Sequence, residues 1–243
     1  MRLGRHFDAL RERRRIKKSI KDLERIKRMY AVNYSKILLP SKTACIVDLG
    51  CGNGEALEWL TDLGYRNLYG VDADAVKLRV VRQRLEGLVP PENIVNGDIL
   101  EFVRACADNS VDIFFMNNII EHLAKTYLLA LIPEIIRSLK PGGILVAKTG
   151  NMENPFNLGL FARDFTHEVF FAGHSLRRLM TMCGFEANMV EVNPVKPGVT
   201  LLNWPLLILS HIMGWILKGV ARLMLIQIRE TAALIYCVAR KGL

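Results

Sequence analysis

VDLGCGNG, residues 47–54, is the stretch of sequence that decides the fold of this chain. It contains the end of a short apolar strand with an aspartate, followed by a glycine-dense turn that leads into EALEWL (55–60), the start of a helix. Glycine is needed where the backbone bends sharply or passes close to a ligand, because it has no Cβ. A strand that leads through such a turn into a helix is typical of the nucleotide-binding corner of an open α/β sheet. We therefore predict an α/β domain that binds a nucleotide at this turn.

Strand-like and helix-like segments alternate on both sides of the turn. We predict strands at 44–50, 67–72, 92–98, 111–117, 144–150, 184–192 and 231–241, and helices at 54–63, 73–87, 99–107, 125–139 and 174–183. Such alternation implies right-handed βαβ units. The predicted fold is a Rossmann-like, seven-stranded, mostly parallel sheet with helices on both faces and an antiparallel last strand. Lys140-Pro141-Gly142-Gly143 is predicted to be a helix stop and turn before the fifth strand.

Charge and hydropathy divide the 243 residues into three parts. The first 30 residues hold 12 basic and four acidic residues, a net charge of +8, whereas the rest of the chain holds 21 basic and 20 acidic residues, a net charge of +1. We predict a basic N-terminal helical arm over 1–40, with its helix at 6–39 ended by Pro40. An α/β domain over 41–193 plus 231–243 follows, interrupted by an apolar helical insertion at 194–230. We expect no secretory signal and reduced cysteines, as in a cytoplasmic protein.

Five motifs in a fixed order carry a resemblance to a known family. They are VDLGCGNG (47–54), GVDAD (70–74), NGDIL (96–100), VDIFFMNNIIEHL (111–123) and LKPGGIL (139–145). Together they resemble the class I S-adenosylmethionine-dependent methyltransferases, over 44–192 and 231–241. The resemblance implies S-adenosyl-L-methionine as the cofactor. A nicotinamide-dependent dehydrogenase is disfavoured, because the turn has GxGxG spacing instead of GxGxxG and no second mononucleotide half follows.

The resemblance implies that the methionine end of the cofactor lies at the first and fourth strands. The turn of Gly50, Gly52 and Gly54 lets the backbone approach that end. Asp48 can accept a hydrogen bond near the cofactor's ammonium group, and Asn117 would lie beside the sulfonium and the acceptor.

The nucleoside end is expected at the second and third strands. Asp72 ends the second strand, where a carboxylate can accept from both ribose hydroxyls, and Ala73 beside it is included among the cofactor-binding residues. Asp98 is placed to accept a hydrogen bond from the adenine amino group, and Ile99 to pack against the edge of the ring.

Glu121-His122 follows the fourth strand, on the rim where an acceptor must lie. A hydroxyl acceptor needs its proton removed as the new bond forms, so a nearby base is expected. We take His122 as one candidate. The resemblance includes members that hold a divalent ion with a neighbouring Glu and His. Asn117 and Asn118 stand where further carboxylates would help, so we predict no metal.

The second candidate base is His167, in DFTHEVFF (164–171). Asp-x-Thr-His followed by aromatic residues resembles methyltransferases found with polysaccharide and lipopolysaccharide assembly genes, in which this loop closes over the acceptor. Asp164 or Glu168 could orient the imidazole and raise its basicity. The alternative is a histidine that only braces the loop.

Residues 199–217 contain no charged side chain and approach the ~20 residues needed to span a bilayer. Because the strands on either side should pair in one sheet, both ends of the insertion must emerge on the same side, which excludes a single crossing. The segment can lie in the membrane interface, with Trp204 and Trp215 at headgroup level and Lys218, Arg222 and Arg229 on anionic lipid. It can also dip in and return around His211–Gly214. The other possibility is a helical pair that packs on the domain or forms a dimer interface.

These observations predict O-methylation of a glycan, lipid-linked sugar or other membrane-held acceptor, at the inner face of the cytoplasmic membrane. The basic cluster RERRRIKK (11–18) suits an anionic membrane surface and would also suit RNA phosphates. The alternative for the arm is a solvated helix whose apolar stripe caps the cofactor site. Nucleic acid is an unlikely partner, because the chain has Asn117-Asn118-Ile119-Ile120 in place of the Asn/Asp-Pro-Pro-aromatic turn of enzymes that methylate base nitrogens. The alternatives are a water-soluble acceptor, an RNA-binding or RNA-modifying protein, and a catalytically silent scaffold that binds the cofactor.

Overall fold

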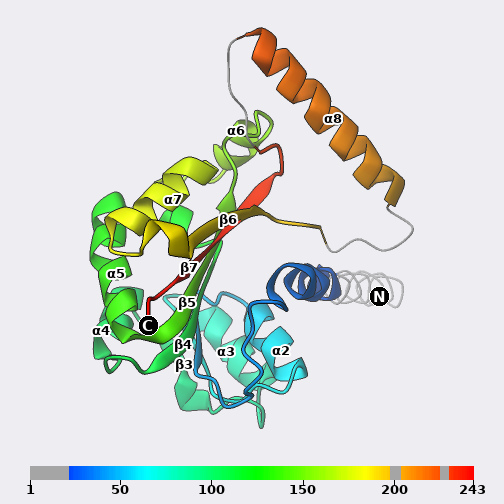
Figure 1. Cartoon of the computed structure of the whole chain (residues 1–243). Helices are drawn as coiled ribbons and strands as arrows, with labels where there is room; N and C mark the ends of the chain where they lie inside the picture. The colour runs from blue at the N-terminus through cyan, green and yellow to red at the C-terminus, as the bar shows by residue number, and fades with distance from the viewer. Residues whose placement is uncertain (1–21, 198–203, 225–229) are drawn as a thin grey trace, which may run out of the picture.

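A seven-stranded sheet forms the centre of the molecule (Figure 1). The computed structural model describes residues 22–197, 204–224 and 230–243. The strands are β1 (Ile46–Leu49), β2 (Leu68–Asp72), β3 (Ile94–Asn96), β4 (Val111–Asn117), β5 (Leu139–Gly150), β6 (Val190–Pro194) and β7 (Leu234–Arg240). Their order is β3-β2-β1-β4-β5-β7-β6, and only β7 runs antiparallel to its neighbours. The predicted fold class is confirmed.

Helices cover both faces of the sheet and give it two hydrophobic cores. The helices are α2 (Glu55–Asp62), α3 (Ala75–Arg84), α4 (Ile99–Ala105), α5 (Lys125–Ser138), α6 (Asn157–Phe161), α7 (Gly173–Met182) and α8 (Trp204–Leu223). Side chains of β4 alternate between the cores. Phe114 packs with α4, α5 and α7, whereas Phe115 packs with α2, α3 and the N-terminal helix (residues 22–34). Both rings are fully buried, each contributing about 1.5–3 kcal/mol to folding.

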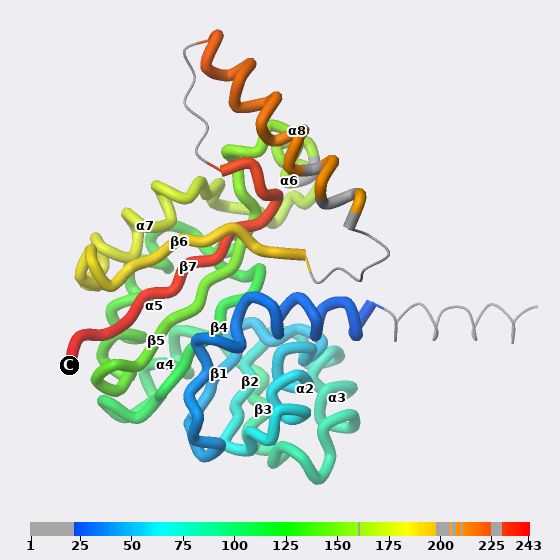
Figure 2. Tube along the Cα trace, turned by 45° about the vertical axis from the view of Figure 1, so that its right-hand side comes forward, coloured from blue at the N-terminus to red at the C-terminus, as the bar shows by residue number. Residues whose placement is uncertain are grey.

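The N-terminal helix ends earlier than predicted. Residues 22–34 are helical, and a turn at 35–38 precedes Pro40, so the predicted end at residue 39 is wrong. The Asn33 amide donates to the carbonyls of Met29 (2.7 Å) and Lys196 (2.8 Å), which fixes the end of the helix to the chain beyond β6. Figure 2 shows this helix lying beside α2. The basic cluster at 11–18 lies outside the described residues.

Strand β5 begins at Leu139, so Lys140–Gly143 is part of the strand and the predicted turn there is wrong. The pairing of β4 with β5 changes register between Val111 and Ile113, as at a β-bulge. The Gly142 N–H donates to the Lys241 carbonyl (3.1 Å), and the Lys241 N–H donates to the Gly143 carbonyl (2.9 Å). Pairing with the end of the chain therefore holds these residues in the sheet.

Two further predictions around α7 need correction. The strand predicted at 184–192 begins only at Val190, because Gly184 turns the chain with φ +119 and residues 187–189 form a 3-10 helix (η3). The segment 151–172, for which no helix or strand was predicted, contains the short helix α6. Neither difference changes the topology of the sheet.

The insertion contains one continuous helix, α8, which projects from the sheet (Figure 1). It runs through His211–Gly214, so the predicted reversal of the chain there is wrong. Gly214 lies against Thr231, whose Oγ1 would be 2.6 Å from a Cβ at that position. Within the described ranges, no helix is long and apolar enough to cross a membrane. Residues 198–203 and 225–229, which include the predicted Arg229 contact, lie outside the description.

Candidate functional site

The glycine turn after β1 is held in a conformation that only glycine adopts without strain. Gly50, Gly52 and Gly54 have φ values of +70, +51 and +75. A Cβ on Gly50 would lie 2.7 Å from the Ile119 side chain, and one on Gly54 would lie 2.9 Å from Val81. At Gly52, by contrast, a Cβ would meet no atom within 4 Å. Gly50 and Gly54 are therefore fixed by packing, whereas Gly52 leaves open space at the turn.

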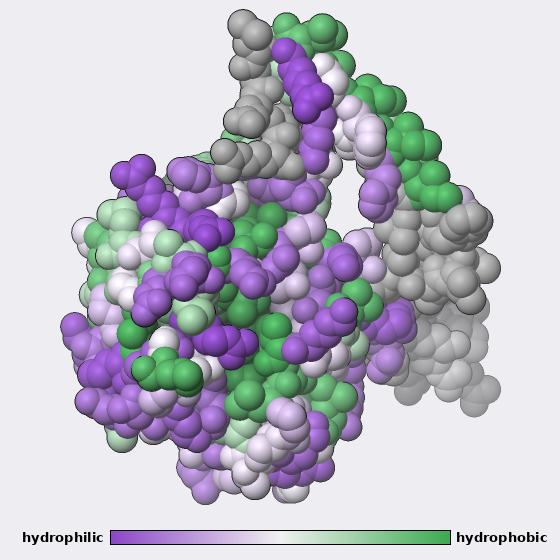
Figure 3. Space-filling model, in the orientation of Figure 1, coloured by the Kyte–Doolittle hydropathy of each residue, from purple (hydrophilic) through white to green (hydrophobic). Residues whose placement is uncertain are grey.

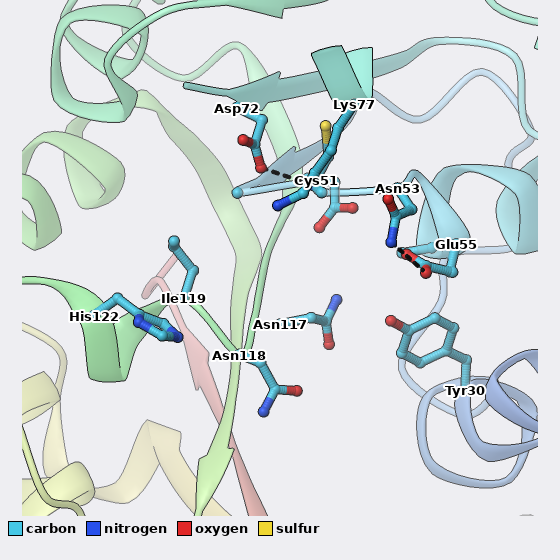
Figure 4. A pocket seen from close by; sticks show the side chains of 14 residues that line it. Tyr30, Cys51, Asn53, Glu55, Asp72, Lys77, Asn117, Asn118, Ile119 and His122 are labelled. Atoms are coloured by element: carbon cyan, nitrogen blue, oxygen red, sulfur yellow. Dashed lines mark hydrogen bonds between the residues drawn. The ribbon is translucent and has the colours of Figure 1, made fainter. Parts of the chain in front are cut away.

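A cavity of about 360 Å³ lies at the carboxyl ends of β1, β2 and β4. We call it the cofactor cavity (Figure 4). It is lined by Tyr30, Asp48, Gly50, Cys51, Gly52, Asn53, Glu55, Ala56, Asp72, Lys77, Asn117, Asn118, Ile119 and His122. Six of the predicted site residues are among these: Asp48, Gly50, Gly52, Asp72, Asn117 and His122. Five are not: Gly54, Ala73, Asp98, Ile99 and His167.

Asp48 is a buried carboxylate, one oxygen of which has no hydrogen-bond donor. It is 2% exposed, and the oxygen without a donor is Oδ1. Burial, together with the negative charge of Glu55, raises the pKa of Asp48 to about 7, against the opposing effects of Asn117 and Lys148. A cation or hydrogen-bond donor bound in the cavity would supply the missing partner.

Asp72 joins the end of β2 to the glycine turn. Its Oδ2 accepts from the Gly52 N–H (2.8 Å) and its Oδ1 accepts from the Asp74 N–H (2.9 Å), as Figure 4 shows for the first of these. Each carboxylate oxygen can accept more than one hydrogen bond, so both keep capacity for a ligand. The carboxylate is thereby fixed in orientation beside the cavity.

Asp98 has a structural role that the sequence did not indicate. It caps α4: Oδ1 accepts from the Glu101 N–H (3.0 Å), and Oδ2 accepts from the Tyr127 hydroxyl (2.8 Å). Ile99 is buried in the core on that face of the sheet. The proposed contacts of Asp98 and Ile99 with adenine stay predictions.

Tyr30 of the N-terminal helix lines the cavity and was missed by the sequence reasoning. Its ring packs on those of Tyr34 and Trp59, each with centroids 5.5 Å apart. The Tyr34 hydroxyl in turn donates to Asn117 Oδ1 (3.1 Å). The N-terminal helix thus covers one side of the cavity. The spacing of Tyr30 and Tyr34, one helical turn apart, was the available signal.

The two candidate bases, His122 and His167, lie together. Their ring centroids are 4.6 Å apart, and the potential metal-binding atoms of Glu121, His122 and His167 all lie within 4.8 Å of one another. The backbone N–H groups of Glu168 and Val169 donate to the Glu121 carbonyl (2.8 and 3.1 Å). These bonds hold the loop after α6 against the end of β4. We call Glu121, His122 and His167 the acceptor-side cluster.

The hydrogen bonds of the cluster fix which ring nitrogen carries the proton. His167 Nδ1 lies 2.7 Å from the Phe161 carbonyl, which can only accept. His122 Nδ1 lies 2.8 Å from the Thr166 hydroxyl, which donates its own proton to Asp164 Oδ1 (2.7 Å). Both Nδ1 atoms are therefore donors, and each Nε2 of the neutral rings keeps a lone pair.

The prediction that Asp164 or Glu168 orients His167 is wrong. The Phe161 carbonyl orients that imidazole, and the Phe161 ring stacks on it with centroids 3.7 Å apart. Asp164 reaches His122 through the Thr166 hydroxyl and interacts with His167 through its charge.

Comparison with known proteins finds methyltransferases. Residues 47–147 match the family described as "Methyltransferase domain". The solved structure of a SAM dependent methyltransferase from Archaeoglobus fulgidus has a TM-score of 0.66 at 20% identity, covering 90% of this chain and 94% of that one. Phosphoethanolamine N-methyltransferase 2 of Haemonchus contortus, solved in complex with S-adenosyl-L-methionine, has a TM-score of 0.53 at 19% identity, covering 86% and 51%. The fold is thus that of S-adenosylmethionine-dependent methyltransferases.

A curated relative is similar over part of the chain. Trans-aconitate 2-methyltransferase of Azoarcus sp. (strain BH72) is 34% identical over 103 residues, which are 42% of this chain and 37% of the relative. The chain spans about two-fifths of the length of the curated relatives it matches. The match over residues 47–147 and the fold both agree with the resemblance to methyltransferases that the motifs carry.

Proposed function

We propose that this chain is an S-adenosylmethionine-dependent methyltransferase that methylates an oxygen of a membrane-held acceptor, such as a lipid-linked sugar. The observation that carries the methyl-transfer part is the buried Asp48 carboxylate, whose Oδ1 has no hydrogen-bond donor, beside the open backbone at Gly52. An ammonium group would pair with that oxygen, and the methionine part of the cofactor has one.

The residues of the cofactor cavity fit the rest of this cofactor. Asp72 would accept from the ribose hydroxyls with the lone pairs left after its two backbone bonds. Tyr30 and Asn117 would lie along the methionine part, since both line the cavity and are connected through Tyr34. When bound, S-adenosylmethionine supplies an activated methyl group on a sulfonium.

The acceptor-side cluster supports an oxygen acceptor. Alignment of the acceptor with the methyl group supplies most of the acceleration in such a displacement, and a base must take the hydroxyl proton. His122 lines the cavity, and His167 stands beside it with its Nδ1 held by the Phe161 carbonyl. We assign His167 as the base and His122 as its neighbour at the rim of the cavity.

Helix α8 supports a membrane-held acceptor. Its exposed apolar residues are Ile208, Leu209, Ile212, Met213, Trp215, Ile216, Val220 and Leu223. Figure 3 shows hydrophobic surface running along the outer side of this helix. Full burial of one such side chain contributes about 1.5–3 kcal/mol. Lys218 and Arg222 on the same helix would meet anionic headgroups.

A matched pair of variants tests membrane binding. Ile216 on α8 and Val80 on α3 are both 54% exposed, so Ile216→Asp and Val80→Asp introduce the same charge at equally exposed apolar positions. In flotation with anionic vesicles, we expect the wild type and Val80→Asp to float and Ile216→Asp to stay with the soluble fraction. Equal behaviour of both variants, or no flotation of the wild type, would contradict the membrane part of the proposal.

The acceptor class is tested with S-adenosylmethionine carrying a labelled methyl group. The protein is incubated separately with a lipid extract of the host cell, with trans-aconitate, which the curated relatives are named for, and with RNA. We expect label in the lipid phase. If the label appeared only in trans-aconitate or only in RNA, that molecule would be the acceptor, and the proposal of a membrane-held acceptor would be wrong. Cofactor binding without turnover on any acceptor would favour a silent scaffold.

A further inference from the structure

We infer that Lys148 of β5 binds the carboxylate of the cofactor's methionine part, while Asp48 of β1 binds its ammonium group. The amino-acid group of S-adenosylmethionine is a zwitterion, and these two residues offer it one buried charge of each sign. This assignment rests on the proposed function, because it takes S-adenosylmethionine as the ligand of the cavity. It predicts that the protein selects cofactors that carry the carboxylate.

Lys148 is a buried cation that lacks an anion. It is 5% exposed. None of the described residues accepts a hydrogen bond from its ammonium group or forms an ion pair with it. Its Nζ atom lies 5.3 Å from the centre of the Tyr30 ring, near the outer limit of a cation–π contact. Because a buried charge without a partner costs free energy, an anion bound beside Lys148 would stabilise the site.

The strand register places Lys148 and Asp48 on the same face of the sheet. Asp48 pairs with Phe115 of β4, and Lys148 pairs with Asn117, two residues further along that strand. Side chains at paired positions point to the same face, and so do side chains two residues apart in one strand. The Phe115 ring packs on that of Tyr34, with centroids 5.4 Å apart. Both charged side chains therefore lie on the face that the N-terminal helix covers.

Lys148 adjoins the cofactor cavity through two residues that line it. Its ammonium group faces the Tyr30 ring, and Asn117 is its strand partner. Only β4 separates β1 from β5, so Asp48 and Lys148 are two strand spacings of ~4.8 Å apart across the sheet. The flexible four-carbon stem of lysine spans part of this separation. The remainder leaves room for an amino-acid group between the carboxylate and the ammonium.

The charges at this place suit a zwitterion better than a lone anion. Burial lowers the pKa of Lys148 to about 8, and the negative charges of Glu121, Asp48 and Glu55 oppose that shift. The same three carboxylates would repel an anionic group of the acceptor. An amino-acid group instead brings its own ammonium to Asp48, so each buried charge gains a partner of opposite sign.

Two ligands that differ only in the carboxylate test the assignment: S-adenosylmethionine and decarboxylated S-adenosylmethionine. Each is titrated by calorimetry into the full chain at about pH 7, where Lys148 is mostly protonated. We expect the wild type to bind S-adenosylmethionine at least about tenfold more tightly, because the decarboxylated compound leaves Lys148 unpaired. Lys148→Met removes the charge from an unbranched side chain. It should weaken binding of S-adenosylmethionine to the level of the decarboxylated compound, whose own affinity should stay nearly unchanged.

Lys36→Met is the matched control. It removes an exposed lysine from the turn after the N-terminal helix and should keep the preference of the wild type for S-adenosylmethionine. Circular dichroism of both variants separates loss of a ligand contact from loss of the fold.

Equal affinity of the wild type for the two compounds would overturn the inference without any variant. It would also be overturned if folded Lys148→Met kept the preference, or if it lost affinity for both compounds alike. A Lys148→Met protein that keeps the preference and loses only turnover would assign Lys148 to the acceptor instead. The proposed function is tested separately: if the wild type binds neither compound, that function is wrong, whereas equal binding of both removes only the role of Lys148.

Discussion

Replacing Asp48 with asparagine should weaken cofactor binding and stabilise the cofactor-free protein. The side chain keeps its shape and loses its charge. In the wild type, the buried carboxylate has an oxygen without a donor, which the ammonium of the cofactor would pair with. Removing one partner of a buried charge pair costs about 2–5 kcal/mol. We therefore expect the dissociation constant of S-adenosylmethionine at pH 8 to rise roughly 30-fold or more, since 1.4 kcal/mol is tenfold.

The stability effect follows from the pKa of Asp48. Burial raises it from 3.8 to about 7, and each unit of difference is worth about 1.4 kcal/mol, so ionised Asp48 costs the folded state about 4 kcal/mol. Below pH 3.8 Asp48 is protonated in both the folded and the unfolded chain, and this cost is absent. Between pH 3.8 and about pH 7 Asp48 ionises in the unfolded chain but not in the folded one, so the cost grows with pH. Above about pH 7 the cost is complete. Asp48→Asn removes this cost of about 4 kcal/mol but buries an amide, which costs about 2 kcal/mol. The variant should therefore be more stable than the wild type by about 2 kcal/mol at pH 8. Toward pH 4 the ionisation cost of the wild type disappears and the amide cost remains, so the variant should there be less stable than the wild type by about 2 kcal/mol.

Calorimetric titration of the cofactor and thermal melting at several pH values measure both effects. In the wild type, the affinity for S-adenosylmethionine should fall about tenfold from pH 8 to pH 6 as Asp48 becomes protonated, and Asp48→Asn should show no such dependence from this group. The melting temperature of the variant should rise by about 4–8 °C at pH 8. A variant that binds the cofactor as tightly as the wild type, or that melts lower at pH 8, would refute the reasoning.

Three further substitutions test other parts of the site. Tyr30→Ala should weaken cofactor binding several-fold, measured by calorimetry, because the N-terminal helix loses its contact with the cavity; unchanged affinity would argue against that helix as a wall of the site. His167→Ala should leave cofactor affinity intact while turnover falls at least tenfold, and unchanged turnover would remove it from the mechanism. Gly50→Ala should lower the free energy of unfolding by about 2 kcal/mol or more, because the alanine would have a left-handed φ and its Cβ would clash with the Ile119 side chain. Denaturant unfolding measures this loss, and an unchanged unfolding midpoint would contradict the geometry of the turn.

The parts of the site that the sequence predicted are those decided by local chemistry. The glycine turn, Asp48 and Asp72 follow from the order of strand, turn and helix within a few residues, and all of them lie where that order indicates. The antiparallel direction of β7 was predicted from the resemblance to the family and is confirmed, whereas the local sequence predicted only that a last strand follows the insertion.

The parts that the sequence could not predict depend on long-range packing. Tyr30 reaches the cavity only because the N-terminal helix packs on Trp59 of α2. The Phe161 carbonyl orients His167 because α6, a helix hidden in a polar segment, precedes the loop. Lys140–Gly143 resembles a turn, yet pairing with Lys241 keeps it in β5. In each case the deciding partner is distant in the chain.

The most direct measurement of the central claim is a calorimetric titration of S-adenosylmethionine, and of its demethylated product, into the purified full chain. If Asp48 and the glycine turn bind the cofactor, both compounds should give saturable heat at one molecule per chain. Asp48→Asn should then bind both compounds clearly more weakly than the wild type. Absence of saturable binding for both compounds would contradict the assignment of the cavity as a cofactor site.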